Sequence, residues 1–158
     1  MKNIYLFTDG SVNTKTKIGF GAYLLVHDLE LSLDLLKEKV IVKQFENTSS
    51  TKLELQTLLW AINQTETTPY NITIFTDSQN ILSLLNRREE MELNNFCSRN
   101  NKLLNNHKLY KEFYAITDKL NCKFAKLDGH KKSSKKNNID MIFTLVDRES
   151  RIALRKNQ

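Results

Sequence analysis

The sequence predicts a mixed α/β fold in which three antiparallel strands come first and two parallel strands alternate with helices. Short apolar runs with strand-like composition occur at 2–8, 19–26, 40–42, 71–76 and 122–127. Apolar residues at helical spacing separate the later runs. Strands joined by short turns pair antiparallel, whereas a strand that re-enters a sheet after a helix runs parallel to its neighbour. We therefore expect five strands in one mixed sheet, flanked by helices.

The first third of the chain contains the antiparallel part. A strand at 2–8 is expected to end in the turn Asp9-Gly10-Ser11, and a short hairpin turn at 12–17 leads to the second strand at 19–26. Leucines alternate with polar residues from Leu29 to Leu35, a period-2 pattern that favours a strand. A clearer β-branched run, 40–42, follows it.

The first long helix is predicted over 51–64, because leucines recur at helical spacing and Ser50 or Thr51 stands near capping-box distance before Glu54. The strand at 71–76 ends at Asp77, and Ser78 is the expected N-cap of the next helix. Residues 86–106 are polar and rich in asparagine, and no element is assigned there. A helix near 108–116, the strand 122–127, a loop of lysine and serine at 131–138 and a final helix complete the order.

Composition sets broad limits on the class of protein. The 158 residues suit a single domain, 1–158, and 40% hydrophobic with 27% charged residues is ordinary for a globular chain. We expect no membrane segment, because no apolar run approaches the ~20 residues that one needs. Two cysteines, Cys97 and Cys122, are too few for a disulfide framework or a zinc site. No signal peptide is recognised, so a cytoplasmic location is the expectation.

The positive charge is concentrated in the last quarter of the chain. The formal net charge is +6, yet residues 119–158 contain eleven Lys and Arg against four acids, while the first 118 residues are close to neutral. A basic region of this kind suits a polyanion, most commonly nucleic acid. A solvated, lysine-rich tail that aids solubility would give the same composition, and charge alone does not separate the two.

Acidic residues follow two of the predicted strands. Asp9 comes after the first and Asp77 after the fourth, so parallel neighbours would bring both carboxylates into one crevice. Glu54 lies in the first turn of the intervening helix, and Asp140 or Asp147 lies on the last one. Each acid alone also fits a turn, a helix first turn or an N-cap. Convergence of several acids would cause strong repulsion, which a pair of Mg²⁺ ions would relieve, so the joint pattern favours a metal site.

Five segments, in order along nearly the whole chain, resemble motifs of the type 1 ribonuclease H family. They are Thr8-Asp9-Gly10-Ser11 with Gly19-Phe20-Gly21-Ala22-Tyr23, Ser49-Ser50-Thr51-Lys52-Leu53-Glu54-Leu55, Thr76-Asp77-Ser78-Gln79, Gly129-His130 and Val146-Asp147-Arg148. Any one of these tetrapeptide-sized matches is weak evidence, but five in register are strong.

The resemblance implies a five-stranded ribonuclease H-like sheet and an endonuclease that cleaves the RNA strand of RNA·DNA hybrids, leaving 5′-phosphate and 3′-hydroxyl ends. It implies that Asp9, Glu54, Asp77 and Asp147 hold two Mg²⁺ ions, with Mn²⁺ as a substitute. His130 would exchange protons near neutral pH, and an exposed loop histidine without a role is the less favoured alternative. The expected substrate contacts are Ser11, Ser49, Ser50, Thr51, Gln79, Lys131 and Lys132.

The chain departs from the family pattern around these motifs. Ser50-Thr51 stands where the family often has Asn-Asn, and a long lysine-rich stretch separates His130 from the last acids. The fourth carboxylate therefore stays open: the Val-Asp-Arg context favours Asp147, whereas Asp140 is nearer the helix start, where the family usually places it. The segment 87–107 has few basic residues, so we expect the lysine loop to supply the basic substrate contacts in its place.

Two other functions use the same fold. One is a nucleic-acid-binding module that has lost cleavage, although acids at all the expected positions argue against it. The other is a DNA-directed nuclease or resolvase, against which the Thr-Asp-Ser-Gln and Gly-His segments argue. Action as a monomer is the expectation.

Overall fold

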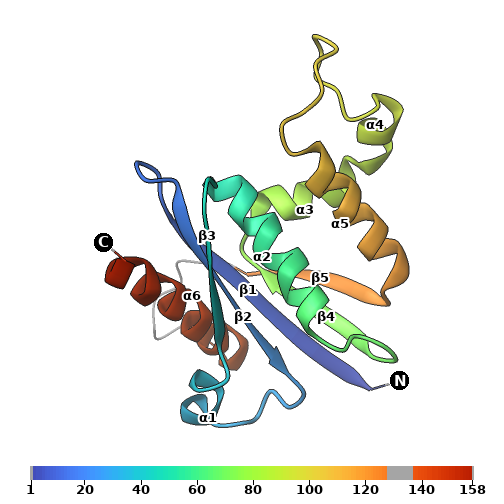
Figure 1. Ribbon diagram of the computed structural model, residues 1–158. Helices are drawn as coiled ribbons and strands as arrows, with labels where there is room; N and C mark the ends of the chain where they lie inside the picture. Colours follow the sequence, from blue (N-terminus) through green and yellow to red (C-terminus); the bar gives the residue numbers. More distant parts are fainter. Residues whose placement is uncertain (1, 128–136, 158) are drawn as a thin grey trace.

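The computed structural model describes residues 2–127 and 137–157, and Figure 1 shows a central sheet with helices packed against it. The elements are, in chain order, β1 (Asn3–Asn13), β2 (Ile18–Val26), α1 (Leu33–Lys37), β3 (Ile41–Phe45), α2 (Ser50–Gln64), β4 (Asn71–Thr76), α3 (Gln79–Asn86), α4 (Arg88–Leu93), α5 (His107–Lys119), β5 (Cys122–Lys126) and α6 (Asn138–Asn157).

The sheet has five strands in the order β3-β2-β1-β4-β5. Strands β1, β2 and β3 pair antiparallel, while β4 pairs parallel with both β1 and β5. The predicted mixed sheet, with three antiparallel strands followed by two parallel ones, is confirmed. Strand β1 lies at the centre, where the antiparallel and parallel halves meet.

Each face of the sheet has its own apolar cluster. Alternate residues of β1 point to opposite faces, so Ile4 and Leu6 pack with α2, α3 and α5, whereas Phe7 packs with α1 and α6. The rings of Phe7 and Phe75 stack at 4.8 Å between centroids on the α6 face. Asp9 has the same parity as Phe7, and this alternation directs it toward α6.

The first strand is longer than the sequence indicated. A turn was expected at Asp9-Gly10-Ser11. Instead β1 continues to Asn13, because β2 pairs with it from Tyr5 opposite Val26 to Asn13 opposite Ile18. The hairpin turn therefore lies at residues 14–17. Asp9 is consequently a strand residue, with a rigid backbone on both sides.

The alternating leucines from Leu29 to Leu35 do not form a strand, so that prediction is wrong. Ser32 caps the short helix α1, its hydroxyl accepting a hydrogen bond from the backbone N–H of Leu35. Leu36, which lies outside the alternating set, is the α1 residue that is buried, against the α6 face. A local cap and one buried contact thus outweigh a period-2 pattern made of a poor strand former.

Helix α2 begins one residue earlier than predicted, with Ser49 rather than Ser50 or Thr51 as its N-cap. This end of α2 lies very close to the sheet, because Gly10 and Gly21 oppose each other on β1 and β2. A Cβ atom at Gly10 would be 2.9 Å from Leu53, and one at Gly21 would be 2.1 Å from the Thr57 hydroxyl. The two glycines therefore allow the approach that places the first turns of α2 on β1 and β2.

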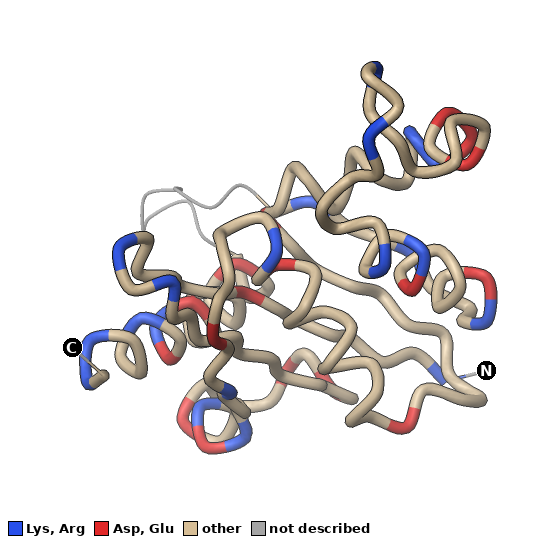
Figure 2. The backbone as a smooth tube through the Cα atoms, turned by 45° about the horizontal axis from the view of Figure 1, so that its top comes forward, with Lys and Arg blue, Asp and Glu red and all other residues tan. Residues whose placement is uncertain are grey.

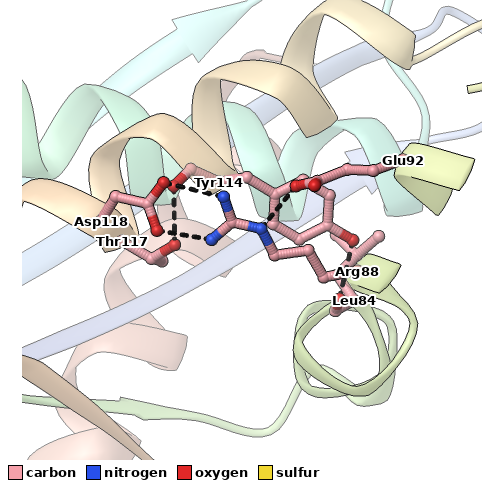
Figure 3. Close-up of polar contacts among 6 residues, drawn as sticks. All are labelled: Leu84, Arg88, Glu92, Tyr114, Thr117 and Asp118. Carbon is pink, nitrogen blue, oxygen red and sulfur yellow. Dashed lines mark hydrogen bonds and ion pairs between the residues drawn. The ribbon is translucent and has the colours of Figure 1, made fainter. Parts of the chain in front are cut away.

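Residues 86–106, for which no element was predicted, include α4 and a loop that projects from the body beside α5 (Figure 1). Arg88 fastens this projection: its guanidinium makes a two-pronged contact with Asp118 of α5, at 2.5 and 2.7 Å, and a third bond to Glu92 (Figure 3). The guanidinium carbon of Arg88 also lies over the ring of Tyr114, 5.1 Å from its centroid. The Tyr114 hydroxyl donates to the carbonyl of Leu84. The charge of Arg88 is thereby offset by Asp118 and Glu92.

Lysine and arginine residues lie along the last turns of α6, as Figure 2 shows. No helix among the described residues is both long and apolar enough to span a bilayer.

Candidate active site

Two acids lie together at the carboxyl ends of the central parallel strands. Phe7 of β1 is in register with Phe75 of β4, so Asp9 and Asp77, each two residues further on, occupy neighbouring positions. A small cleft at this edge is lined by Asp9, Glu54 and Asp77 together with their neighbours Thr8, Thr76, Ser78 and Ile81. The crevice expected between the two strand ends is present, although Asp9 reaches it from within a strand.

Asp147 approaches Asp9 from α6, which covers the face of the sheet toward which Asp9 points. It lies on α6, which packs on β1 and β2, and its carboxyl is within hydrogen-bonding reach of the Asp9 carboxyl. The backbone carbonyl of Asp147 accepts a hydrogen bond from Ser150, whose fully buried hydroxyl is 2.9 Å from that of Ser11 on β1. This serine pair links α6 to β1 one turn from Asp147.

Glu54 enters the cleft from α2 and is fastened to the turn that follows β4. Its Oε2 accepts a hydrogen bond of 2.5 Å from the Ser78 hydroxyl, which also accepts from the backbone N–H of Ile81 as the N-cap of α3. Burial raises the pKa of Glu54, the bond from Ser78 lowers it, and the charge of Asp77 raises it. Ser78 thus positions Glu54 beside Asp77.

The four acids form a continuous electrostatic group centred on Asp9. Burial is the largest cause that raises the pKa of Asp9, to about 9, and Asp147 and Asp77 add to it. A carboxyl in this position retains its proton unless a cation compensates the charge. A nearby positive charge would act in the opposite direction and lower the pKa of Asp9.

Asp140, the alternative fourth acid, has a different role at the start of α6. Its backbone N–H donates to the Asn137 side chain, and its carboxylate accepts from the Asn137 backbone N–H. This reciprocal pair is a capping box, and Asp140 is buried, at 6% exposure. Asp147 instead contacts Asp9, and Arg151 one turn later donates to it at 3.0 Å.

The donor set suits a hard divalent cation, because Asp9, Glu54, Asp77 and Asp147 offer only carboxylate oxygens. Within residues 2–127 and 137–157, no three His, Cys, Asp or Glu side chains lie close enough to coordinate one ion in the arrangement observed. Two interactions engage these carboxylates elsewhere: Glu54 accepts a hydrogen bond from Ser78, and Asp147 is paired with Arg151. Cation binding would thus require these carboxylates to come closer together.

Neutralising Asp9 is expected to stabilise the metal-free protein. Because its pKa is raised from 3.8 to about 9 on folding, the folded state binds the proton more tightly, and stability falls as pH rises between these values. Asp9→Asn removes this slope, so in EDTA at pH 8 its melting temperature should exceed that of the wild type by about 2–6 °C. Thermal melts of both proteins from pH 5 to 9 measure the effect. Parallel curves, with no difference in slope, would contradict the buried-charge interpretation.

The predicted substrate contacts fall into three groups. Ser50 and Thr51 are exposed at the start of α2, on the side of the cleft that holds Glu54, while the Ser49 hydroxyl caps that helix. The Ser11 hydroxyl is engaged with Ser150, and Gln79 is exposed at the start of α3. The other three predicted site residues, His130, Lys131 and Lys132, lie outside the described residues.

A second hollow was not predicted from the sequence and has none of the four acids in its lining. It has a volume of about 540 Å³ and lies on the projecting segment, between α4 and the loop that follows. Arg87, Arg99 and several asparagines line it. Its only visible signal in the sequence is the asparagine content, which allows left-handed backbone at Asn95 and Asn101.

Comparisons with known proteins agree with this architecture. Residues 1–144 match the RNase H family. The solution structure of the PFV RNase H domain is similar, with a TM-score of 0.68 and 15% identity over 94% of each chain. A foamy viral protease-reverse transcriptase, solved in complex with dsDNA, has a TM-score of 0.63 and 14% identity over 94% of this chain and 92% of that one. No curated protein matches the chain.

Proposed function

Because the chain belongs to the RNase H family, we propose that it is a metal-dependent endonuclease that cleaves the RNA strand of RNA·DNA hybrids. The products would carry 5′-phosphate and 3′-hydroxyl ends. The family match includes Asp9, Glu54, Asp77 and Asp140 and ends three residues before Asp147. The inclusion of Asp147 in the acid cluster is supported by its contact with Asp9.

The observation that carries the proposal is the position of Asp9. It lies on a rigid central strand, between Asp77 from the neighbouring strand and Asp147 from the helix behind it, and the pKa of Asp9 is raised by burial and by both neighbours. A purely structural carboxylate is normally paired with a cation or with several N–H donors. Asp9 has two carboxylates beside it instead, which is the arrangement that a bound cation stabilises.

We propose that the fourth acid is Asp147 and not Asp140. The Asp140 carboxylate is buried in the capping box of α6, whereas Asp147 faces Asp9. Asp9, Glu54, Asp77 and Asp147 would hold Mg²⁺, with Mn²⁺ as a substitute. The chemistry that bound ions supply in such a site is activation of a water and neutralisation of charge on the leaving 3′ oxygen.

The protein's own groups would bind and orient the hybrid around this centre. Ser50, Thr51 and Gln79 present exposed hydroxyl and amide groups on the two helices that flank Glu54 and Asp77. Such groups can contact the 2′-hydroxyl, which distinguishes RNA from DNA in the shallow groove of a hybrid. His130, Lys131 and Lys132 stay proposed as a proton-exchanging residue and as phosphate contacts.

The proposal is tested by offering the protein three end-labelled duplexes: an RNA·DNA hybrid, double-stranded RNA and double-stranded DNA. With Mg²⁺ we expect cleavage of the RNA strand of the hybrid alone, and none in EDTA. Salt-dependent binding of the hybrid without a Mg²⁺-dependent product would indicate a binding module. Cleavage of the DNA duplex would indicate a DNA-directed nuclease.

A further inference from the structure

The strand end next to Asp77 carries a cation for which the acid site gives no role. Lys126 is the last residue of β5 and lies opposite Thr76 of β4, the residue directly before Asp77. The following backbone N–H, that of Leu127, donates to the Thr76 carbonyl at 3.0 Å. The backbone of Lys126 is therefore held at the same edge of the sheet as Asp77.

The ammonium of Lys126 is directed toward the start of α3. It donates to Oε1 of Gln79 at 3.1 Å, and Gln79 is the first residue of α3, two positions after Asp77. Because 47 positions separate the two residues in sequence, the contact depends on the tertiary fold. Both side chains are exposed, so packing does not explain why they meet.

The Lys126–Gln79 pair differs in charge from the Arg151–Asp147 pair on α6. Arg151 donates to the Asp147 carboxylate, so its charge is offset by a neighbouring acid. Gln79 is neutral, and its amide oxygen can orient the Lys126 ammonium without neutralising it. The interaction also leaves the Gln79 amide nitrogen, a hydrogen-bond donor, with a defined orientation.

We propose that Lys126 contacts a phosphate of the nucleic acid on the Asp77 side of the cleft and orients Gln79 toward the same strand. The inference rests on the proposed function and adds a substrate-positioning pair to it. A divalent cation at the acids and a lysine at the edge would then divide the phosphate charge between them, with the lysine contributing to binding and not to the reacting bond.

The test compares Lys126→Met with Lys123→Met, a matched control on the same strand. Lys123 is also exposed, but it lies opposite Thr73, three residues from the edge that carries Asp77. Lys126→Met should raise KM for the hybrid about fivefold, with a smaller change in kcat, and should reduce the slope of log K against log salt by about 1. Lys126→Arg should restore most of the affinity, and Lys123→Met should behave like the wild type.

Three results separate this inference from the proposed function. Equal KM and equal salt slope for the two methionine variants would overturn it, even if the wild type cleaves the hybrid. A lower melting temperature with kcat and KM changed together, and no change in salt slope, would also overturn it, since it would show a structural role. If the wild type shows no cleavage, the proposed function fails, while a reduced salt slope for hybrid binding would still support Lys126 as a phosphate contact.

Discussion

Asp147→Asn is expected to abolish hybrid cleavage, whereas Asp140→Asn should leave it close to the wild-type rate. Asp147 lies against Asp9, so its loss removes one of the carboxylates that would hold the cation. Removing a single electrostatic group that acts on the transition state typically costs about 10²–10³-fold in rate. Asparagine has nearly the same shape as aspartate, so the loss should come without a change of fold.

Asp140→Asn has its effect on stability instead. Its carboxylate accepts the Asn137 backbone N–H in the capping box of α6, and asparagine retains an oxygen for that bond. We expect a cost of about 0.5–1 kcal/mol from the weakened cap. Single-turnover cleavage rates and urea unfolding of both variants decide the assignment. The opposite pattern, with Asp140→Asn inactive and Asp147→Asn active, would transfer the role to Asp140.

Gly21→Ala should cause the largest loss of stability among the substitutions considered. A Cβ atom at Gly21 would be 2.1 Å from the Thr57 hydroxyl and 3.0 Å from its Cβ, so α2 must move away from the sheet. Overpacking of this kind costs about 1–3 kcal/mol, which corresponds to about 2–4 °C in melting temperature per kcal/mol. Because Glu54 lies on the same end of α2, cleavage should fall as well.

Two further variants make the Gly21 prediction specific. A Cβ atom at Gly19 would be 2.8 Å from Leu53 Cδ2, 3.1 Å from Thr48 Cγ2 and 3.3 Å from the Ser11 backbone oxygen. None of these contacts is as short as the 2.1 Å at Gly21, so the cost of Gly19→Ala should be smaller. Gly21→Ala with Thr57→Ala removes the two shortest contacts, and Thr57 Oγ1 makes no hydrogen bond among the described residues that would be lost. The double variant should recover much of the stability. An unchanged melting temperature for Gly21→Ala would contradict the claim that the two opposed glycines are needed for the close approach of α2.

The parts of the site that sequence predicts well are those fixed by local chemistry. The Thr76-Asp77-Ser78 turn, with Ser78 as N-cap of α3, follows from a β-branched strand and a serine before a helix, and both features are found. The choice between Asp140 and Asp147 was left open, although the spacing of Asn137 and Asp140 is itself a capping-box signal.

The parts that sequence does not predict depend on contacts between distant segments. The end of β1 is set by its pairing with β2, so Asp9 could not be placed inside the strand from its own neighbours. Arg88 meets Asp118 across 30 positions, and Lys126 meets Gln79 across 47. The strong local signal of alternating leucines was misleading, because burial of Leu36 in the tertiary fold decides the structure of that segment.

The measurement that tests the central claim most directly is cleavage of a hybrid labelled on its RNA strand by the wild type and by Asp77→Asn. Asp77 directly follows β4 and lies beside Asp9, and it is predicted to hold the cation without contributing to the core. With Mg²⁺ we predict cleavage by the wild type, loss of at least about 10²-fold in the variant, and none for either in EDTA. Equal cleavage by wild type and Asp77→Asn would contradict the account.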